Sequence, residues 1–332
     1  MSFIVQFNFF IKIMRMNRIF LGTVALSLLV ACSEQELLVN EVEEECAPLG
    51  VEAEVSSGTA GRSRTSTENN RVSFTNGDKI GFYMPEAETS GQWTYQDQKW
   101  TTDDSYVWPD KSSTLNFCAY YPFVQAESRT SITMPDLSKQ DGTVANIGKY
   151  DFLVARCSSN YAKRKGIVSF TGEEAFQHVS SLVAITLKTG ADTKQAELTE
   201  ISLKAKGMVT TSTYHFAEMA EDDGVTVSQS AVDELTLSGL SAEIPLAGQS
   251  YMFIVNPLTN SETLDIAVKY NRGDKSFTAA TQISTKEMAK GSMSKLTISI
   301  KKSGLVVEGN TVEDWTENSL GEIIVEESES QQ

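Results

Sequence analysis

The sequence predicts an all-β protein of antiparallel sandwich domains, and three observations lead to this fold class. Short runs rich in β-branched and aromatic residues recur along the chain with turn-forming residues between them, which is typical of a sandwich or barrel. Apolar residues rarely recur at the 3.6-residue spacing of a helix. The part of the chain after residue 31 is about 300 residues long, and a single core stops growing near that size, so we expect two domains.

Residues 1–31 have the layout of a secretory signal peptide. Arg15 and Arg18 precede a largely apolar run at 19–31, which is shorter than the roughly 20 residues that a membrane-spanning helix needs. Translation can begin at Met1 or at Met16, and both starts leave this run intact. The sequence therefore predicts an exported protein.

The apolar run ends in Leu29-Val30-Ala31-Cys32, which resembles a bacterial lipobox. This resemblance implies that Cys32 carries the lipid and becomes the first mature residue. The membrane would then hold the protein only through acyl chains, each buried CH₂ contributing about 0.8 kcal/mol. The alternative, a buried helix that ends in a chance cysteine, is disfavoured because core helices seldom follow a basic N-terminal flank.

Residues 32–45 are predicted to form an acidic tether. Residues 33–45 contain six glutamates and no basic residue, so this stretch should be solvated and keep the following domain away from the membrane. The composition also resembles the surface-export signal of lipoproteins in gut and oral anaerobes. The charge pattern does not distinguish that signal from a plain linker.

The overall charge and the short motifs disfavour several classes of protein. The formal net charge is −16, with 44 acidic and 28 basic residues, whereas a nucleic-acid-binding protein needs a basic stripe. We find no close Cys/His pairs for zinc, no phosphate-binding or dinucleotide fingerprint, and no Gly-x-Ser-x-Gly elbow beside either histidine. We therefore expect no enzyme, no metal and no cofactor, and we predict that His178 is a hydrogen-bonded core or strand-end residue.

With Cys32 taken by the lipid, three cysteines remain, namely Cys46, Cys118 and Cys157. An odd number allows at most one disulfide within the chain. We predict that Cys118 and Cys157 are buried as small apolar residues in strands.

The predicted N-terminal domain, 46–190, begins with a strand and a loop. Residues 51–55, VEAEV, alternate between apolar and acidic, as a half-buried strand does. Residues 56–70 are small and polar, so we expect an exposed loop. Arg62 and Arg64 lie in this loop, and exposed loops of this kind are where proteases cut.

The rest of this domain is predicted from turns and apolar runs. Asn76-Gly77 is a strong signal for a tight turn. Five large aromatic residues between 92 and 108 could form a sugar-binding platform, but burial in the core is the favoured interpretation: Trp93, Tyr95, Trp100, Tyr106 and Trp108. The further strand runs of this domain are 113–123, 150–156, 166–170 and 175–188.

The predicted C-terminal domain, 191–332, follows a break in the pattern at 189–193. Asp223-Gly224 indicates a hairpin between its flanking runs. The expected strand runs are 198–203, 210–216, 224–227, 235–237, 250–255, 264–270, 276–280 and 296–300, followed by an apolar stretch within 312–325.

Arg272-Gly273-Asp274 is a candidate adhesion loop between two of these runs. The Arg-Gly-Asp tripeptide is recognised by some host-cell adhesion receptors, and its place between strands predicts an exposed hairpin. Plain turn chemistry is the favoured interpretation, since tripeptide matches carry a high false-positive risk.

Taken in order, several motifs resemble the fimbrillin family. They are the lipobox, an Ala-Gly-Arg-Ser-Arg loop at 60–64, Asn-Gly-Asp-Lys-Ile-Gly at 76–81, Tyr-x-Trp-Pro at 106–109, Phe-x-Ala-Tyr-Tyr-Pro at 117–122, Phe-x-His-x-x-Ser at 176–181, and the run 291–300 followed by Val312-x-x-Trp315. The resemblance implies two transthyretin-like antiparallel β-sandwich domains in tandem. It also implies export as a lipoprotein, cleavage by an arginine-specific protease at Arg62 or Arg64, and polymerisation by strand exchange.

The expected function is thus a structural or adhesive subunit of a cell-surface pilus, anchored in the outer membrane by its lipid. Its partners would be other pilus subunits, the arginine-specific maturation protease, and a host receptor or glycan, with no nucleic acid. The exchanged strand would be 51–55, and the run 320–325 would be either the donor strand or the last strand of the second domain. A surface glycan-binding lipoprotein that does not polymerise, and a hydrolase on a β-sandwich, are the alternatives.

Overall fold

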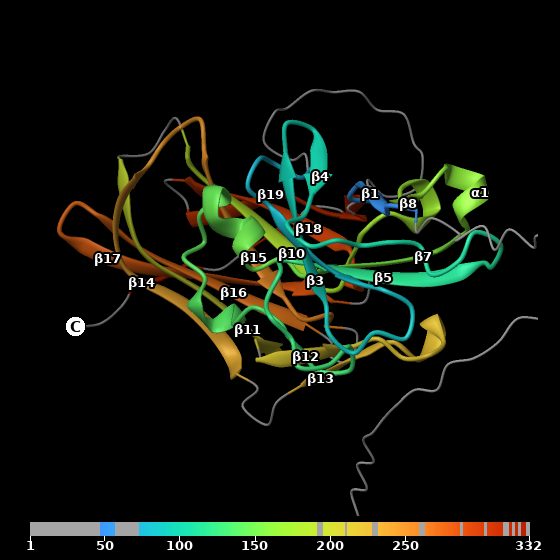
Figure 1. Cartoon of the computed structure of the whole chain (residues 1–332). Helices are drawn as coiled ribbons and strands as arrows, with labels where there is room; N and C mark the ends of the chain where they lie inside the picture. Colours follow the sequence, from blue (N-terminus) through green and yellow to red (C-terminus); the bar gives the residue numbers. More distant parts are fainter. Residues whose placement is uncertain are drawn as a thin grey trace, which may run out of the picture. The chain divides into compact units, whose positions relative to one another are not determined.

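The computed structural model describes residues 47–56, 73–190, 195–209, 211–227, 232–258, 263–285 and 288–301. It also describes the backbone of four strands near the C-terminus, 304–314, 319–320, 323–324 and 327–329. Figure 1 shows that strands dominate the described part of the chain. These residues all belong to one compact unit, Cys46–Gln332.

The first half of the chain forms a six-stranded antiparallel sheet in the order β4-β3-β2-β5-β7-β9. A separate pair, β1 (Gly50–Ala53) and β8 (Ile167–Phe170), runs parallel; it lies at the right of Figure 1. The strands of the six-stranded sheet are β2 (Lys79–Tyr83), β3 (Gly91–Gln96), β4 (Lys99–Thr101), β5 (Leu115–Tyr121), β7 (Leu153–Ser159) and β9 (Gln177–His178).

Both faces of this sheet are covered. On one face, Phe82 and Phe117 pack with Val51 of β1 and Phe170 of β8 in one apolar core. The other face carries Tyr83, Cys118 and Tyr120, and it packs against residues of a three-stranded sheet. That sheet has the order β13-β12-β6 and consists of β6 (Ile132–Thr133), β12 (Ser212–His215) and β13 (Gly224–Val227).

The second half of the chain forms two further sheets, of five and six strands, that share a third core. One has the order β14-β11-β16-β17-β22, with β11 (Ala196–Val209), β14 (Val232–Ile244), β16 (Thr263–Arg272), β17 (Lys275–Ser284) and β22 (Glu327–Glu329). The other has the order β15-β10-β18-β19-β20, with β10 (Ser181–Thr189), β15 (Gln249–Val255), β18 (Ser292–Lys301), β19 (Gly304–Asp314), β20 (Ser319–Leu320) and β21 (Ile323–Ile324), which also pairs with β19.

Helices are few and short in the described residues. The one α-helix there is α1 (Tyr161–Arg164), and the 3₁₀ turns are η1 (Leu137–Lys139), η2 (Val144–Lys149), η3 (Gly172–Glu174) and η4 (Ala220–Asp222). No helix in this part of the chain is long and apolar enough to cross a membrane. The predicted all-β class is therefore confirmed, with one difference: β1–β8 and β10–β18 are parallel pairs in an otherwise antiparallel fold.

The run at 175–188, expected as one strand, is divided into two. The backbone N–H of Val179 donates to Phe152 O at 3.1 Å, and Ser180 O accepts from Gly291 N at 2.8 Å. These bonds end β9 in the first-half sheet and begin β10 in a sheet of the second half. The division at residue 190 stays a prediction, although β10 before it pairs with β15 and β18 after it.

Two predicted turns have different outcomes. Asn76-Gly77 forms the expected tight turn, in which Asp78 N donates to Thr75 O at 2.9 Å. The strands β12 and β13 pair antiparallel as expected, but the connection does not turn tightly at Asp223-Gly224. The connection between His215 and Gly224 passes through η4 instead, and the Asp223 carboxylate binds Arg156 of β7, as described below.

The aromatic run between 92 and 108 lies in the core, as favoured. Trp93, Trp100 and Trp108 are only 3%, 7% and 3% exposed, and the indole N–H of Trp108 donates to Gly166 O at 2.8 Å. Tyr95 and Tyr106 are partly buried against the same core. The indole faces are therefore covered, and the sugar-platform interpretation of this run is wrong.

Cys118 and Cys157 are buried free thiols in neighbouring strands, as predicted. The register pairs Cys118 with Arg156 and Phe117 with Cys157, so the two thiols point to opposite faces of the sheet. They belong to different cores accordingly, and this arrangement keeps them apart. Burial raises the pKa of the Cys157 thiol to about 12, and burial also raises the pKa of Cys118.

We expect both thiols to be inert in the native protein. The thiolate is the reactive form, and a raised pKa together with burial suppresses it at mildly alkaline pH. Alkylation of Cys118 and Cys157 by iodoacetamide should be on the order of 100-fold slower than in guanidinium chloride. Peptide mass spectrometry measures each site separately, and rapid labelling of either thiol in folded protein would contradict the burial.

Candidate functional site

Some of the predicted site residues belong to the described part of the chain and others do not. Cys32, Arg62 and Arg64 lie outside the described residues. Residues 272–274 lie at the end of β16 and in the turn that follows it. The segments that flank 57–72 are described, and they show how the chain enters and leaves the arginine-bearing stretch.

The segment 47–56 is held by main-chain hydrogen bonds to three parts of the chain. Trp108 N donates to Ala47 O, and Leu49 N donates to Tyr106 O, both at 2.9 Å. Further along, Gly50 N donates to Gly166 O and Glu54 N donates to Phe170 O, each at 2.9 Å. The final contact is Ser56 N to Phe176 O at 2.8 Å. The segment therefore lies in a groove whose walls are residues 106–108 on one side and β8 on the other.

The side chains of this segment alternate as the sequence predicted. Val51 is buried in the first core, and Ala53 and Val55 are partly buried against it. Glu52 is exposed. Leu49 and Val51 each contribute roughly 1.5–3 kcal/mol by burial, so β1 completes the core of the first sheet.

The chain after the arginine-bearing stretch is anchored separately by Phe74. Its ring contacts Trp100 at 4.9 Å, Phe176 at 5.3 Å and Tyr121 at 5.6 Å between centroids, each edge-on. Edge-to-face aromatic pairs contribute about 0.5–1.5 kcal/mol each beyond their burial. Phe74 would therefore stay on the body of the protein if the chain were cut between residues 56 and 73.

The C-terminal run 320–325 contributes to a sheet of its own chain. Leu320 of β20 pairs with Asn310, and β21 pairs with Val306 and Val307, all in β19. Of the two interpretations left open, these pairings agree with a last strand of the second half. They describe one subunit, and they do not test what the run does in a neighbouring subunit.

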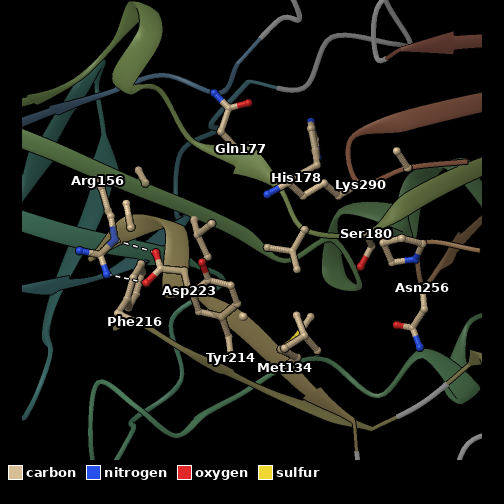
Figure 2. Close-up of a pocket in the computed structure, with 18 of the residues that line it drawn as sticks. Met134, Arg156, Gln177, His178, Ser180, Tyr214, Phe216, Asp223, Asn256 and Lys290 are labelled. Carbon is tan, nitrogen blue, oxygen red and sulfur yellow. Dashed lines mark hydrogen bonds and ion pairs between the residues drawn. The ribbon is translucent and has the colours of Figure 1, made fainter. Parts of the chain in front are cut away.

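A second feature is a cavity of about 1130 Å³, drawn in Figure 2. It is lined by β7, β9, β12 and β13 together with residues near 206, 256 and 290. At one end the Arg156 guanidinium binds Asp223, with Nε to Oδ2 at 2.6 Å and Nη2 to Oδ1 at 2.5 Å. Asp223 Oδ1 also accepts from Ala217 N at 2.7 Å, so the pair fixes the η4 loop on β7.

His178 forms a buried pair beside this cavity. Its Nδ1 lies 2.8 Å from Asp151 Oδ2 and 3.1 Å from Asp151 Oδ1. His178 is 5% exposed at the end of β9, so the prediction of a hydrogen-bonded strand-end residue is confirmed. Within the described ranges, no three His, Cys, Asp or Glu side chains are placed to hold a metal ion.

Arg272-Gly273-Asp274 occupies the predicted exposed hairpin. Arg272 pairs with Lys275 across a two-residue turn, where Gly273 has φ 65°. The Arg272 guanidinium lies over the rings of Phe277, at 4.7 Å, and Tyr270, at 5.6 Å, and its Nη2 donates to Tyr270 Oη at 3.1 Å. Its charge is thus directed onto the sheet, whereas Asp274 is exposed.

We expect Asp274→Glu to leave host-cell adherence unchanged. The substitution keeps the charge at an exposed turn position but changes the shape that an Arg-Gly-Asp receptor reads, and a plain turn tolerates that change. Adherence of cells producing each form measures it, with Asp103→Glu, at an exposed position in another loop, as the control. A clear drop for Asp274→Glu alone would show that the tripeptide is an adhesion site.

The sequence did not identify the Arg156–Asp223 pair or the cavity. Arg156 and Asp223 are 67 residues apart; Arg156 stands in no recognisable motif, and the Asp223-Gly224 pair indicates only a turn. The alternation Val225-Thr226-Val227 predicts a strand, but nothing in these adjacent residues indicates that the strand lies at the edge of a sheet.

Comparison with known proteins identifies the fold and the family. The described strands resemble the crystal structure of a candidate cell adhesion protein from Bacteroides uniformis, with 21% identity, a TM-score of 0.53, and coverage of 82% of this chain and 99% of the other. A candidate cell adhesion protein from Bacteroides ovatus gives 14% identity and a TM-score of 0.52, with 81% and 98% coverage. A fimbrial protein from Bacteroides vulgatus gives 14% identity and a TM-score of 0.51, with 81% and 99% coverage.

At these identities the three structures establish the fold alone. None of the proteins with curated descriptions matches the sequence. The model of the fimbrillin-like family, however, matches residues 63–315, which is most of the chain. The resemblance drawn from the ordered motifs is thereby confirmed, and the protein belongs to the fimbrillin-like family.

Proposed function

We propose that the protein is a structural or adhesive subunit of a cell-surface pilus that assembles by strand exchange. One observation supports strand exchange as the mechanism of assembly. The segment 47–56 completes the core of the first sheet, yet the chain between this segment and the body contains Arg62 and Arg64. Membership in a fimbrillin-like family, a family of structural proteins, supports this function over an enzyme.

In the proposed mechanism, an arginine-specific protease cuts after Arg62 or Arg64. The segment 47–56 is then no longer joined to the body, while Phe74 keeps the new end of the body in place. Departure of the segment exposes the backbone groups of β8 and the apolar side chains beneath it, among them Val168 and Phe170. Such an open groove is the hazard that sheets normally avoid.

A strand from the next subunit would fill this groove by β-augmentation. Each main-chain bond regained contributes about 0.5–1.5 kcal/mol net, and each buried side chain adds roughly 1.5–3 kcal/mol. A strand with the length of 47–56 can therefore hold two subunits together. The donor strand would be the run 320–325 of the neighbour, released from its own sheet.

The finer features of the proposal concern export and partners. The subunit would be an outer-membrane lipoprotein attached through Cys32, and it would contact other pilus subunits, the maturation protease, and a host receptor or glycan. Electron microscopy of a strain that lacks the gene tests the function itself. We expect absent or shortened fibres that return on complementation, and unchanged fibres in the deletion strain would refute a role in the pilus.

A further inference from the structure

Exposed apolar residues are concentrated in the part of the chain around β13. Six large apolar residues in the described part of the chain are more than a third exposed: Val107, Met219, Val225, Val227, Val232 and Leu246. Four of them lie between residues 219 and 232, the stretch that contains β13. Scattered apolar residues on a surface need no explanation, but a group of them does.

β13 is also an open sheet edge. It is the outer strand of β13-β12-β6, and among the described strands it pairs only with β12. Three of its four residues are exposed, including Val225 at 37% and Val227 at 48%. Natural proteins usually protect such an edge with charge, proline or a covering segment, and β13 itself, Gly-Val-Thr-Val, has neither a charged residue nor a proline.

The two valines extend the floor of the cavity shown in Figure 2. The register places Val225 opposite Tyr214 and Val227 opposite Ser212, and directly opposed residues share one face of a sheet. Tyr214 and Met134 line the cavity together with Val225 and Val227. An apolar surface thus runs from the buried floor of the cavity out to the unpaired edge.

The cavity carries opposite charges at its two ends. Three glutamates line the cavity at the end that holds the Arg156–Asp223 pair: Glu173, Glu174 and Glu221. Glu221 lies two residues before Asp223, and Glu174 accepts a hydrogen bond from Ser158 N of β7. Figure 2 places Asn256 at the opposite side from Arg156.

A lysine lies toward the Asn256 end. Asn256 Nδ2 donates to Gly207 O at 3.2 Å, and Lys206, which precedes Gly207, lines the cavity there; Lys290 is labelled beside His178, between Arg156 and Asn256. Arg156 and Asp223 neutralise each other, and His178 is held by Asp151. The remaining charges are therefore acidic at one end and basic at the other.

We propose that β13 and this cavity bind an extended segment of a partner protein. An unpaired sheet edge offers its N–H and C=O groups to an added strand. The row of Val225, Val227 and Tyr214 selects apolar residues at alternate positions of that strand. The charges at the two ends select a basic residue at one terminus of the segment and an acidic residue at the other, which fixes its direction. This site is separate from the groove of 47–56 and does not depend on strand exchange.

Two labelled peptides test the proposal, Lys-Val-Thr-Val-Thr-Val-Glu and its charge-reversed form Glu-Val-Thr-Val-Thr-Val-Lys. They are titrated with protein purified from cells that express the full-length chain, and binding is measured by fluorescence anisotropy. We expect one of the two to bind at least about tenfold more tightly than the other, and the difference to shrink as salt screens the charges. No binding of either peptide, or equal binding of both, would overturn the proposal.

Variants locate the binding. Val225→Lys with Val227→Lys should weaken the preferred peptide at least about tenfold, and Leu246→Lys, at a residue 65% exposed elsewhere, should not. If the double variant does not fold, Glu221→Lys on the exposed η4 turn replaces it and must also weaken binding. Unchanged binding in a folded variant overturns the proposal. The site could instead bind a second copy of the chain or a glycan. If these variants abolish self-association or glycan binding and the wild-type protein binds neither peptide, the site has another occupant and the proposal is overturned.

Discussion

The double variant Arg62→Ala with Arg64→Ala should remain uncut in this stretch and monomeric in the presence of an arginine-specific protease, while the wild-type protein forms oligomers. The physical reason is that the segment 47–56 stays covalently joined to the body, and its main-chain bonds to 106–108, β8 and Phe176 keep the groove filled. A filled groove offers no edge to a second subunit. Size-exclusion chromatography with light scattering measures the outcome.

Two controls make this test specific. Arg164→Ala, at an exposed residue of α1, should assemble as the wild type does. A chain in which residues 62–64 are replaced by the recognition sequence of a different protease should assemble only when that protease is added. If the uncut double variant enters fibres as readily as the wild type, strand exchange through this segment is wrong for this chain.

Cys32→Ala should abolish acylation, because the thiol of the lipobox cysteine is the group that accepts the lipid. A lipoprotein with several acyl chains is held by about 0.8 kcal/mol per buried CH₂, so loss of the chains should move the protein from the membrane fraction to the soluble fraction. Labelling with a palmitate analogue, followed by fractionation, measures both effects. Cys46→Ala is the matched control and should keep its label, and undiminished label on Cys32→Ala would show that another residue carries the lipid.

The sequence alone determined the features that depend on short, contiguous stretches. The alternation in 51–55 predicted that Val51, Ala53 and Val55 face the core, and they do. The tight turn at Asn76-Gly77 and the hairpin at residues 272–275 were predicted from local turn signals, and the burial of Cys118 and Cys157 from the usual placement of free cysteines. Side-chain period and turn chemistry are properties of a few adjacent residues, so they can be read without knowing the partner strand.

The ordered motifs went further, because a set of weak signals in a fixed order is far more specific than any one of them. They led to the fimbrillin-like family, and the match of the family model to residues 63–315 then established that family. The placement of Cys32, Arg62 and Arg64 in export and maturation remains a proposal, since these residues lie outside the described part of the chain.

Only the tertiary structure decided which strands pair and what lies between the sheets. β1 runs parallel to β8 more than a hundred residues later, and the run 175–188 breaks because Val179 and Ser180 bond to two different parts of the chain. The Arg156–Asp223 pair and the open edge of β13 arise in the same way. Long-range pairing depends on the sum of many contacts in the folded chain and leaves no periodic signal in either segment, so the residues that form the cavity became recognisable only once the fold had brought them together.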